Sequence, residues 1–269
     1  MSKLRNHLGI KHFGNMRITL FQTNISWLDP ATNLQQAEEM LGSAPESDLF
    51  IFPEMFTTGF TMEPEKTAGK AKLALEWLKR QAEIFDAAVC ATVPCDYDGG
   101  FYNRCVFIKP NGETSIYDKR HLFTYSGEDE RYTHGHDRVV VEWRGVRFLL
   151  QVCYDLRFPV FSRNCKDYDV ALYLANWPES RRAVWDILLK ARAIENQCYV
   201  AGVNRVGDDP MCHYNGGTAI ISPYGTVISQ CPDNERSSVS AILDIDKLQA
   251  FREKFPVLDD ADPFKLAYP

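Results

Sequence analysis

The hydrophobic and polar positions along the chain follow two patterns, one typical of buried β-strands and the other of amphipathic helices. Short strand-like apolar runs occupy residues 17–23, 48–53, 88–94 and 169–175. Apolar side chains at helical spacing, three and four residues apart, occupy residues 29–41, 71–85 and 182–196. Because strands and helices alternate along the chain, the pattern predicts a protein of the α/β class.

Two predicted hairpins interrupt this alternation in the middle of the chain. Asn111-Gly112, the strongest short hairpin signal, connects the first pair of strands, and Arg144-Gly145 connects the second. The paired strands are expected at residues 103–110 with 113–117, and 138–143 with 146–152. Further strands and a last helix are expected at residues 199–206, 218–222, 226–230, 238–244 and 245–255. This order predicts a mixed sheet, or two stacked sheets, with helices outside.

The domain organisation is expected to be simple. No stretch rich in proline, glycine and serine divides the chain, and we find no internal repeat, so residues 16–269 are expected to form one domain. Residues 1–15 lack the apolar segment, roughly 7–15 residues long, of a secretory signal peptide. We expect them to form a loosely ordered leader, and the protein to be cytoplasmic.

Composition and charge exclude several classes of partner. Of 269 residues, 45% are hydrophobic and 25% charged, which is ordinary for a globular protein with a sizeable core. Lys and Arg number 30 against 36 Asp and Glu, so the net charge of −6 leaves no broad basic face for nucleic acid. No apolar run approaches the roughly 20 residues that span a membrane. The expected partner is therefore a small molecule or another protein.

Cysteine usage agrees with a reducing compartment. The eight cysteines form no CxxC pair and no tight cluster, which favours reduced and mostly buried thiols in a cytosolic protein.

Three chemically active side chains stand where predicted strands end, which is where α/β folds place their sites. Glu54 follows the apolar run 49–53, and Lys119 follows the strand that ends at residue 118. Cys153 follows the strand 146–152, and Pro159, six residues later, suits the first turn of a helix, so Cys153 lies in a predicted strand-to-helix turn. Taken singly, each residue also has an ordinary structural interpretation: a capping or ion-pairing Glu, a solvated edge Lys, and a buried inert thiol.

Taken together, these three groups suffice for hydrolysis without histidine. The carboxylate takes the thiol proton, and the cationic amine stabilises the negative charge that develops on the carbonyl oxygen. The sulfur attacks an amide carbonyl, ammonia leaves, and water then cleaves the thioester. The separations along the chain, 65 residues from Glu54 to Lys119 and 34 from Lys119 to Cys153, mean that only folding can assemble this site.

Three stretches of the sequence resemble the signature motifs of the nitrilase, or carbon–nitrogen hydrolase, superfamily. They are Phe52-Pro53-Glu54-Met55, Tyr117-Asp118-Lys119-Arg120-His121-Leu122 and Val152-Cys153-Tyr154-Asp155-Leu156-Arg157-Phe158-Pro159. The resemblance runs from about residue 17 to about residue 255. It implies a four-layer α-β-β-α sandwich and a catalytic triad of Glu54, Lys119 and Cys153.

The same resemblance implies further site residues and an assembly. The amide N–H of Tyr154 would bind the oxyanion together with Lys119. A second glutamate would orient the lysine and the substrate: Glu128 is our choice, and Glu130 is the reserve. A homodimer is expected, with its interface near Phe158, Val160 and Phe161.

Other stretches are similar to the ω-amidase branch of that superfamily, whose members release ammonia from the terminal amide of 2-oxo acids such as 2-oxoglutaramate and 2-oxosuccinamate. The similarity rests on Thr57-Thr58-Gly59-Phe60, Asn176-Trp177-Pro178, residues 191–197 and Asn204-Arg205-Val206-Gly207. It implies that Phe60, Asn176 and Trp177 border the substrate. An anionic substrate needs a cationic partner, for which Arg181 and Arg182 are the candidates, with Arg182 preferred. Phe60 replaces the Tyr of some animal ω-amidases, which removes a hydroxyl from this position.

Several alternatives stay open on the sequence. The scaffold also suits an aliphatic amidase, an N-carbamoyl hydrolase, a nitrilase, or a non-catalytic binding protein. His134 and His136 lie two residues apart in a loop, but a zinc site needs further ligands and none stands at a suitable spacing. We expect no metal and no cofactor.

Overall fold

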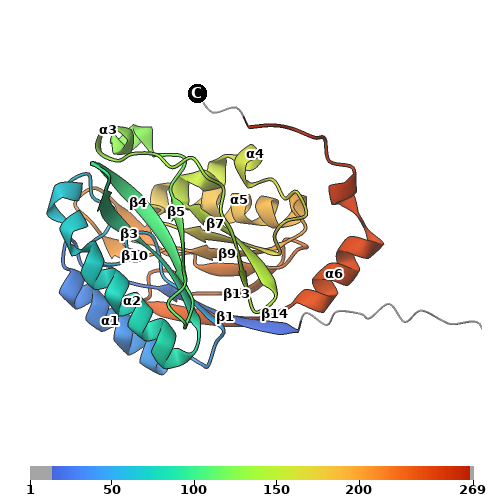
Figure 1. Ribbon diagram of the computed structural model, residues 1–269, viewed down its shortest axis with the longest axis horizontal. Helices are drawn as coiled ribbons and strands as arrows, with labels where there is room; N and C mark the ends of the chain where they lie inside the picture. The colour runs from blue at the N-terminus through green and yellow to red at the C-terminus, as the bar shows by residue number, and fades with distance from the viewer. Residues whose placement is uncertain (1–13, 267–269) are drawn as a thin grey trace, which may run out of the picture.

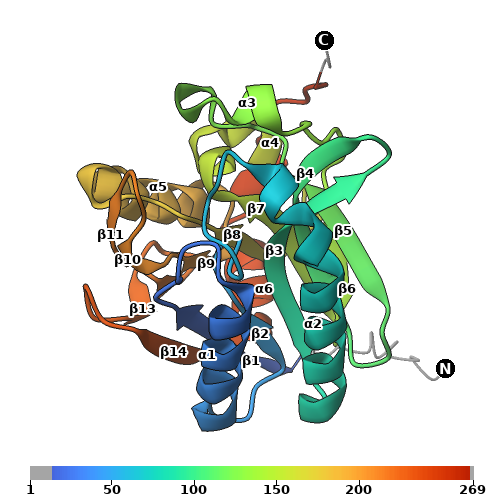
Figure 2. The same ribbon diagram turned by 90° about the vertical axis from the view of Figure 1, so that its left-hand side faces the viewer.

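Two six-stranded β-sheets stack face to face in the computed structural model, which describes residues 14–266 (Figures 1 and 2). The order in the first sheet is β14 (Ser237–Asp244), β1 (Asn15–Gln22), β2 (Leu49–Ile51), β3 (Ala88–Tyr97), β4 (Gly100–Ile108) and β5 (Thr114–Asp118). The order in the second sheet is β13 (Val227–Gln230), β12 (Ala219–Ile221), β9 (Tyr199–Val203), β8 (Val170–Leu174), β7 (Val146–Val152) and β6 (Val140–Trp143).

Helices cover the outer faces of both sheets. Helices α1 (Pro30–Ser43) and α2 (Ala71–Phe85) pack on the first sheet, and α5 (Arg182–Glu195) packs on the second. In Figure 2, α5 lies on the left of the molecule, and α1 and α2 lie toward the bottom. This arrangement is the α-β-β-α sandwich, so the predicted fold class is confirmed.

The strands that are buried on both faces explain why the apolar runs are nearly continuous. Leu49 and Ile51 of β2 point into the core between the sheets, whereas Phe50 between them packs under α1 and α2. In β7, Leu150 faces the same central core, and its neighbour Leu149 faces the α5 side. Alternate side chains of a strand point to opposite faces, so a strand covered on both sides must be apolar at every position.

Strand direction brings the ends of several strands to one edge. Strands β1, β2 and β3 run parallel, as do β7, β8 and β9. Strand β5 is two antiparallel steps from β3, so it runs in the same direction as β3. The carboxyl ends of β2 and β5 therefore lie at the same edge of the first sheet, where the residues that follow them, among them Glu54 and Lys119, can meet.

The structure differs from the prediction in three places. The expected strand 199–206 is divided: β9 ends at Val203, and β10 (Val206–Asp208) pairs instead with β11 (His213–Asn215). The division arises because Asn204 leaves the sheet and hydrogen-bonds the loop that carries Trp177.

The other two differences are a turn and a helix. An unpredicted turn at Asp98-Gly99, where both residues have positive φ, extends β3 and β4 into a long hairpin. Helix α3 (Glu128–Arg131) was also not predicted.

The ends of the chain complete the architecture. Helix α6 (Ile245–Lys254) follows β14 directly and is capped by Asp244, whose side chain accepts from the amide of Lys247. The first strand starts at Asn15, one residue before the expected domain boundary, and most of the expected leader lies outside the described residues. Among the described helices, none is long and apolar enough to cross a membrane.

The packing of α5 on the second sheet gives a stability prediction. A Cβ atom at Gly202 of β9 would lie 2.4 Å from Leu189 Cδ1 and 3.0 Å from Trp185 Cζ2, both buried in α5. We expect Gly202→Ala to lower the free energy of unfolding by about 1–3 kcal/mol through overpacking, as measured by urea denaturation. The matched control is Gly42→Ala in α1, where a Cβ meets nothing within 4 Å. This control is expected to be neutral or slightly stabilising, and an unaffected Gly202→Ala protein would contradict the argument.

Candidate active site

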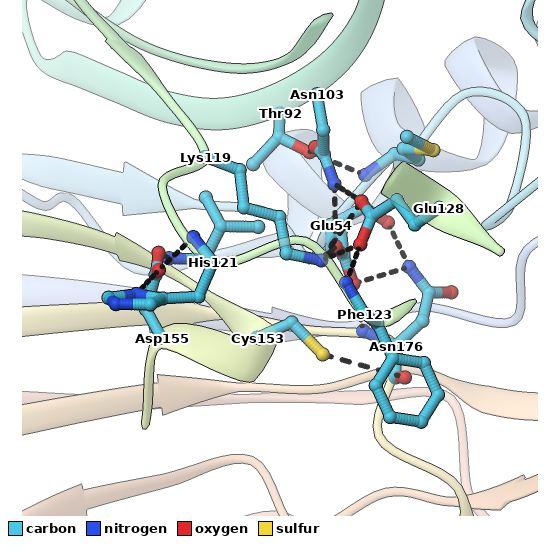
Figure 3. A network of polar contacts seen from close by, with 12 residues as sticks. Glu54, Thr92, Asn103, Lys119, His121, Phe123, Glu128, Cys153, Asp155 and Asn176 are labelled. Carbon is cyan, nitrogen blue, oxygen red and sulfur yellow. Dashed lines mark hydrogen bonds and ion pairs between the residues drawn. The ribbon is translucent and has the colours of Figure 1, made fainter. Parts of the chain in front are cut away.

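The three predicted catalytic side chains meet at the edge where strands of both sheets end (Figure 3). Lys119 Nζ lies 3.0 Å from Glu54 Oε1, and both side chains are fully buried. Cys153, which follows β7 in the second sheet, lies beside them with its sulfur 3.8 Å from the carbonyl oxygen of Asn176. Folding therefore assembles the carboxylate, the ammonium and the thiol that the sequence places far apart.

Glu54 is held by hydrogen bonds at both carboxylate oxygens. Oε1 accepts from Lys119 Nζ and, at 2.7 Å, from Asn103 Nδ2. Oε2 accepts from the backbone N–H of Asn176 at 2.8 Å. The next residue, Met55, has a positive φ of 45°, and its N–H donates to Thr92 Oγ1. These contacts fix the carboxylate in one orientation, which a general base requires.

Lys119 lies between two carboxylates. Besides Glu54, its Nζ contacts Glu128 Oε1 at 3.0 Å and Oε2 at 2.8 Å. Burial by itself lowers the pKa of Lys119, but the carboxylates of Glu128 and Glu54 outweigh it and raise that pKa well above its ordinary value. Lys119 is therefore an ammonium at neutral pH, and its charge is available to an oxyanion.

The second glutamate that contacts Lys119 is Glu128, whereas the reserve candidate Glu130 is exposed. Glu128 is the first residue of α3, and its Oε2 also accepts from the N–H of Phe123 at 2.6 Å. Burial raises the pKa of Glu128, Lys119 opposes the shift, and the nearby Glu54 carboxylate adds to it. The two carboxylates thus share one cation, and all three side chains are fully buried.

Cys153 occupies a strained turn between β7 and the short 3₁₀ helix Cys153–Arg157. Its φ of 46° is in the left-handed region, which costs a non-glycine residue roughly 1–3 kcal/mol and recurs at functional sites. Burial raises the pKa of the Cys153 thiol well above its ordinary value, the Glu54 carboxylate raises it further, and Lys119 acts in the opposite direction. The resting side chain is therefore a thiol, and attack on a substrate requires removal of its proton.

A hydrogen-bond network that we did not predict links the nucleophile turn to the lysine loop. Asp155 Oδ2 accepts from the N–H of Val152 at 2.8 Å and from the hydroxyl of Tyr117 at 2.7 Å. Asp155 Oδ1 accepts from the N–H of His121 and lies 2.7 Å from its Nδ1. Asp155 thereby joins the turn of Cys153 to the segment that follows β5.

Asn103 is the other residue that the sequence analysis missed. Its Nδ2 bridges Glu54 Oε1 and Glu128 Oε1, at 2.7 and 3.2 Å. The available signal was an amide side chain at the start of a predicted strand, because a buried amide there needs polar partners. For Asp155, the signal was an acidic residue in the first turn after the nucleophile.

A cavity of about 770 Å³ opens above Cys153. Its lining includes the four expected substrate-binding residues Phe60, Tyr154, Asn176 and Trp177. The expectation for Arg182 is corrected: this side chain does not line the cavity, because it pairs with Asp186 and Asp233, each at 2.8 Å. Its neighbour Arg181 lines the cavity instead, together with Arg157.

The loop histidines are not grouped with further ligands. The rings of His134 and His136 lie 4.7 Å apart, and within residues 14–266 there is no group of three His, Cys, Asp or Glu side chains that could hold a metal ion.

Comparison with known proteins places this geometry in a family. The family model described as "Carbon-nitrogen hydrolase" matches residues 17–253. The "Omega-amidase YafV" of Yersinia enterocolitica is 45% identical over 252 residues, which cover 93% of this chain and 98% of the relative. The "2-oxoglutaramate amidase" of Bacillus subtilis is 32% identical over 250 residues, covering 90% and 96%.

Solved structures agree with the sequence relatives. The CN-hydrolase superfamily protein XC1258 from Xanthomonas campestris, which carries an arsenic adduct in its active site, superposes with a TM-score of 0.91. It is 39% identical, and the match covers 94% of this chain and all of that one. The family model and these relatives span nearly the whole described chain. The chain therefore belongs to the carbon–nitrogen hydrolase family.

Proposed function

We propose that the protein is an ω-amidase, which hydrolyses the terminal amide of a small monoamide of a dicarboxylic acid, such as 2-oxoglutaramate or 2-oxosuccinamate, to the acid and ammonia. The observation that carries the proposal is the buried Glu54–Lys119–Glu128 cluster beside Cys153. The cavity above the sulfur admits a small substrate. Relatives named ω-amidase at 44–45% identity support this substrate class.

In the first half of the proposed reaction, the amide carbonyl carbon lies above Cys153 Sγ. Glu54 accepts the thiol proton as the sulfur attacks, and the carbonyl oxygen becomes an oxyanion. Lys119 and the N–H of Tyr154 donate to that oxygen. Glu54 returns the proton to the nitrogen, ammonia leaves, and the acyl group remains as a thioester on Cys153.

In the second half, Glu54 accepts a proton from water, and the resulting hydroxide attacks the thioester carbonyl. Lys119 and the Tyr154 amide stabilise the second oxyanion as they did the first. The carbon–sulfur bond breaks, the proton returns from Glu54 to the sulfur, and the carboxylic acid product leaves. Glu128 takes no proton in either step: it positions Lys119, keeps it charged, and shares Asn103 with Glu54.

We further propose a cytoplasmic homodimer. The eight cysteines are all free, as expected in a reducing compartment. Val160 is 55% exposed on the short helix α4 (Pro159–Ser162), and it borders a shallow cavity together with Phe158. An apolar residue exposed beside a hollow suits contact with a second copy. Phe161 is mainly a core residue, 3% exposed, and it lines the same cavity.

Cys153→Ala should abolish ammonia release from 2-oxoglutaramate and 2-oxosuccinamate, because without the sulfur no thioester can form. The measurement is steady-state ammonia production, with circular dichroism to verify that the variant folds. As a matched control we suggest Cys165→Ala, which removes an exposed thiol remote from the cluster and should leave turnover intact. Substantial hydrolysis by a folded Cys153→Ala protein would refute the proposed mechanism.

Glu128→Gln should lower kcat far more than Glu130→Gln does. An amide at position 128 cannot hold the charge of Lys119, so we expect a loss approaching the 10²–10³-fold that removal of one oxyanion donor causes. Glu130 is exposed and serves as the matched control. Steady-state kinetics on the two purified variants, with their melting temperatures, makes the comparison. Equal effects, or a larger loss at position 130, would assign the second glutamate differently.

The pH titration of Cys153 provides a test of its environment. Because its pKa is raised, the thiol should keep its proton at pH about 8.5, where an ordinary cysteine is half ionised. The ultraviolet thiolate absorbance of the protein minus that of Cys153→Ser should then show no ionisation step at or below that pH. A step at neutral pH would mean that Lys119 outweighs burial and Glu54, and that the resting nucleophile is a thiolate.

A further inference from the structure

Asn103 contacts all three charged residues of the buried cluster. Its Nδ2 donates to Glu54 Oε1 and to Glu128 Oε1, at 2.7 and 3.2 Å. Its backbone carbonyl oxygen accepts from the N–H of Lys119 at 3.0 Å. Asn103 is fully buried in β4, and it is not among the residues that line the cavity above Cys153. Its side chain therefore acts on the cluster and not on the substrate.

The direction of the Asn103 amide is fixed by Thr92 of the neighbouring strand β3. The N–H of Met55 donates to Thr92 Oγ1 at 2.7 Å, and the Thr92 hydroxyl in turn donates to Asn103 Oδ1 at 3.1 Å. The amide oxygen is thereby engaged, and the amide nitrogen faces the carboxylates, which when ionised can only accept. Figure 3 shows this chain of contacts from Thr92 through Asn103 to the two glutamates.

The charge balance of the cluster gives this amide a specific effect. Two carboxylates share one ammonium, so the cluster carries one negative charge in excess when both glutamates are ionised. Glu54 Oε1 and Glu128 Oε1 each accept from the same two donors, Lys119 Nζ and Asn103 Nδ2. Without the amide, only the ammonium would lie between the two like charges, and the pair would take up a proton more readily.

The other titratable and charged groups near the cluster do not supply a second donor. The Tyr132 hydroxyl donates to a backbone carbonyl oxygen at 2.8 Å, and burial raises the pKa of Tyr132 well above its ordinary value. Cys153 is a thiol at rest, because burial raises its pKa. Arg104, the residue after Asn103 in β4, pairs with Asp118 at 2.7 Å.

We propose that Asn103, oriented by Thr92, is a positioning residue that keeps Glu54 and Glu128 ionised together, and so keeps Glu54 available as the base. The inference rests on the proposed function and adds a residue to its mechanism. The base must be ionised to take the thiol proton, so its protonation sets the acidic limb of the pH profile. The hydrogen bonds from Asn103 to the ionised pair therefore extend activity to lower pH.

Asn103→Leu removes the donor and roughly keeps the size of the side chain. We expect the acidic limb of kcat/KM for 2-oxoglutaramate to move to higher pH by about one unit or more, because hydrogen bonds to an ionised pair are lost. At the pH optimum, kcat should fall with little change in KM, because Asn103 does not line the cavity.

The matched control is Asn164→Leu. Asn164 is also buried, its Nδ2 donates twice and its Oδ1 accepts once, but all of these partners are backbone groups. This control should lower the melting temperature and leave the acidic limb in place.

Two substitutions at Thr92 test the orientation of the amide without removing it. Thr92→Val removes the hydroxyl that holds Asn103 Oδ1, and it should move the limb in the same direction, by less than Asn103→Leu does. Thr92→Ser keeps a hydroxyl and should return the limb to that of the unmodified protein. This pair of variants decides the role of Asn103 if Asn103→Leu does not fold.

Alkylation of Cys153 by iodoacetamide supplies a readout that needs no turnover. The sulfur attacks as Glu54 takes its proton, so the rate of labelling also depends on the ionised base. Mass spectrometry of the Cys153 peptide as a function of pH should show the same displacement of the acidic limb in Asn103→Leu.

The outcomes separate this inference from the function on which it rests. If the profiles of Asn103→Leu and Thr92→Val superpose on that of the unmodified protein after scaling, the inference is refuted and the amidase function stands. An equal displacement in Thr92→Ser or in Asn164→Leu would also refute it, because the shift would then report lost packing. If the unmodified protein releases ammonia from no amide, the proposed function fails, and the pH dependence of alkylation decides the role of Asn103.

Discussion

The buried ion pairs of Lys119 are the interaction on which the rest of the site depends. One ammonium lies within 3.0 Å of two carboxylates, Glu54 and Glu128, and all three side chains are fully buried. Removing one partner of such a group leaves an uncompensated buried charge, which typically costs about 3–5 kcal/mol. The surrounding polar contacts reduce this cost by satisfying the carboxylate oxygens, through Asn103, the N–H of Asn176 and the N–H of Phe123. The cluster is therefore a constraint on the fold as well as the centre of the proposed mechanism.

That constraint spans both sheets. Glu54 and Lys119 follow strands of the first sheet, whereas Cys153 and Asn176 follow strands of the second. Asn176 joins the two directly, because its backbone N–H donates to Glu54 Oε2 and its side-chain amide donates to the carbonyl oxygen of Glu54 at 2.6 Å. The packing of the central core thus sets the distance between the base and the nucleophile. In a close-packed interior, changes to that core are transmitted to the site.

Chemistry and recognition are divided between two environments. The charged cluster beside Cys153 is fully buried. The cavity in front of the sulfur is lined by aromatic side chains and by the half-buried Arg157 and Arg181. Such a division separates the proposed proton-transfer groups from the residues that line the cavity. The buried cluster contains residues of the family motifs. The lining of the cavity is where the specificity of this chain is proposed to arise.

The local pattern of the sequence determined the elements, because a strand covered on both faces must be apolar throughout and a covering helix must be apolar on one face. Helix α2 was predicted with its observed bounds, and the motifs indicated three side chains that lie together in the structure, Glu54, Lys119 and Cys153. The sequence could not decide which side chains meet across the two sheets, since Asn103 and Asp155 act through residues far away in the chain. It also could not distinguish Arg181 from Arg182: adjacent side chains at the start of a helix point in different directions. Only the positions of Asp186 and Asp233 show that the second is already paired.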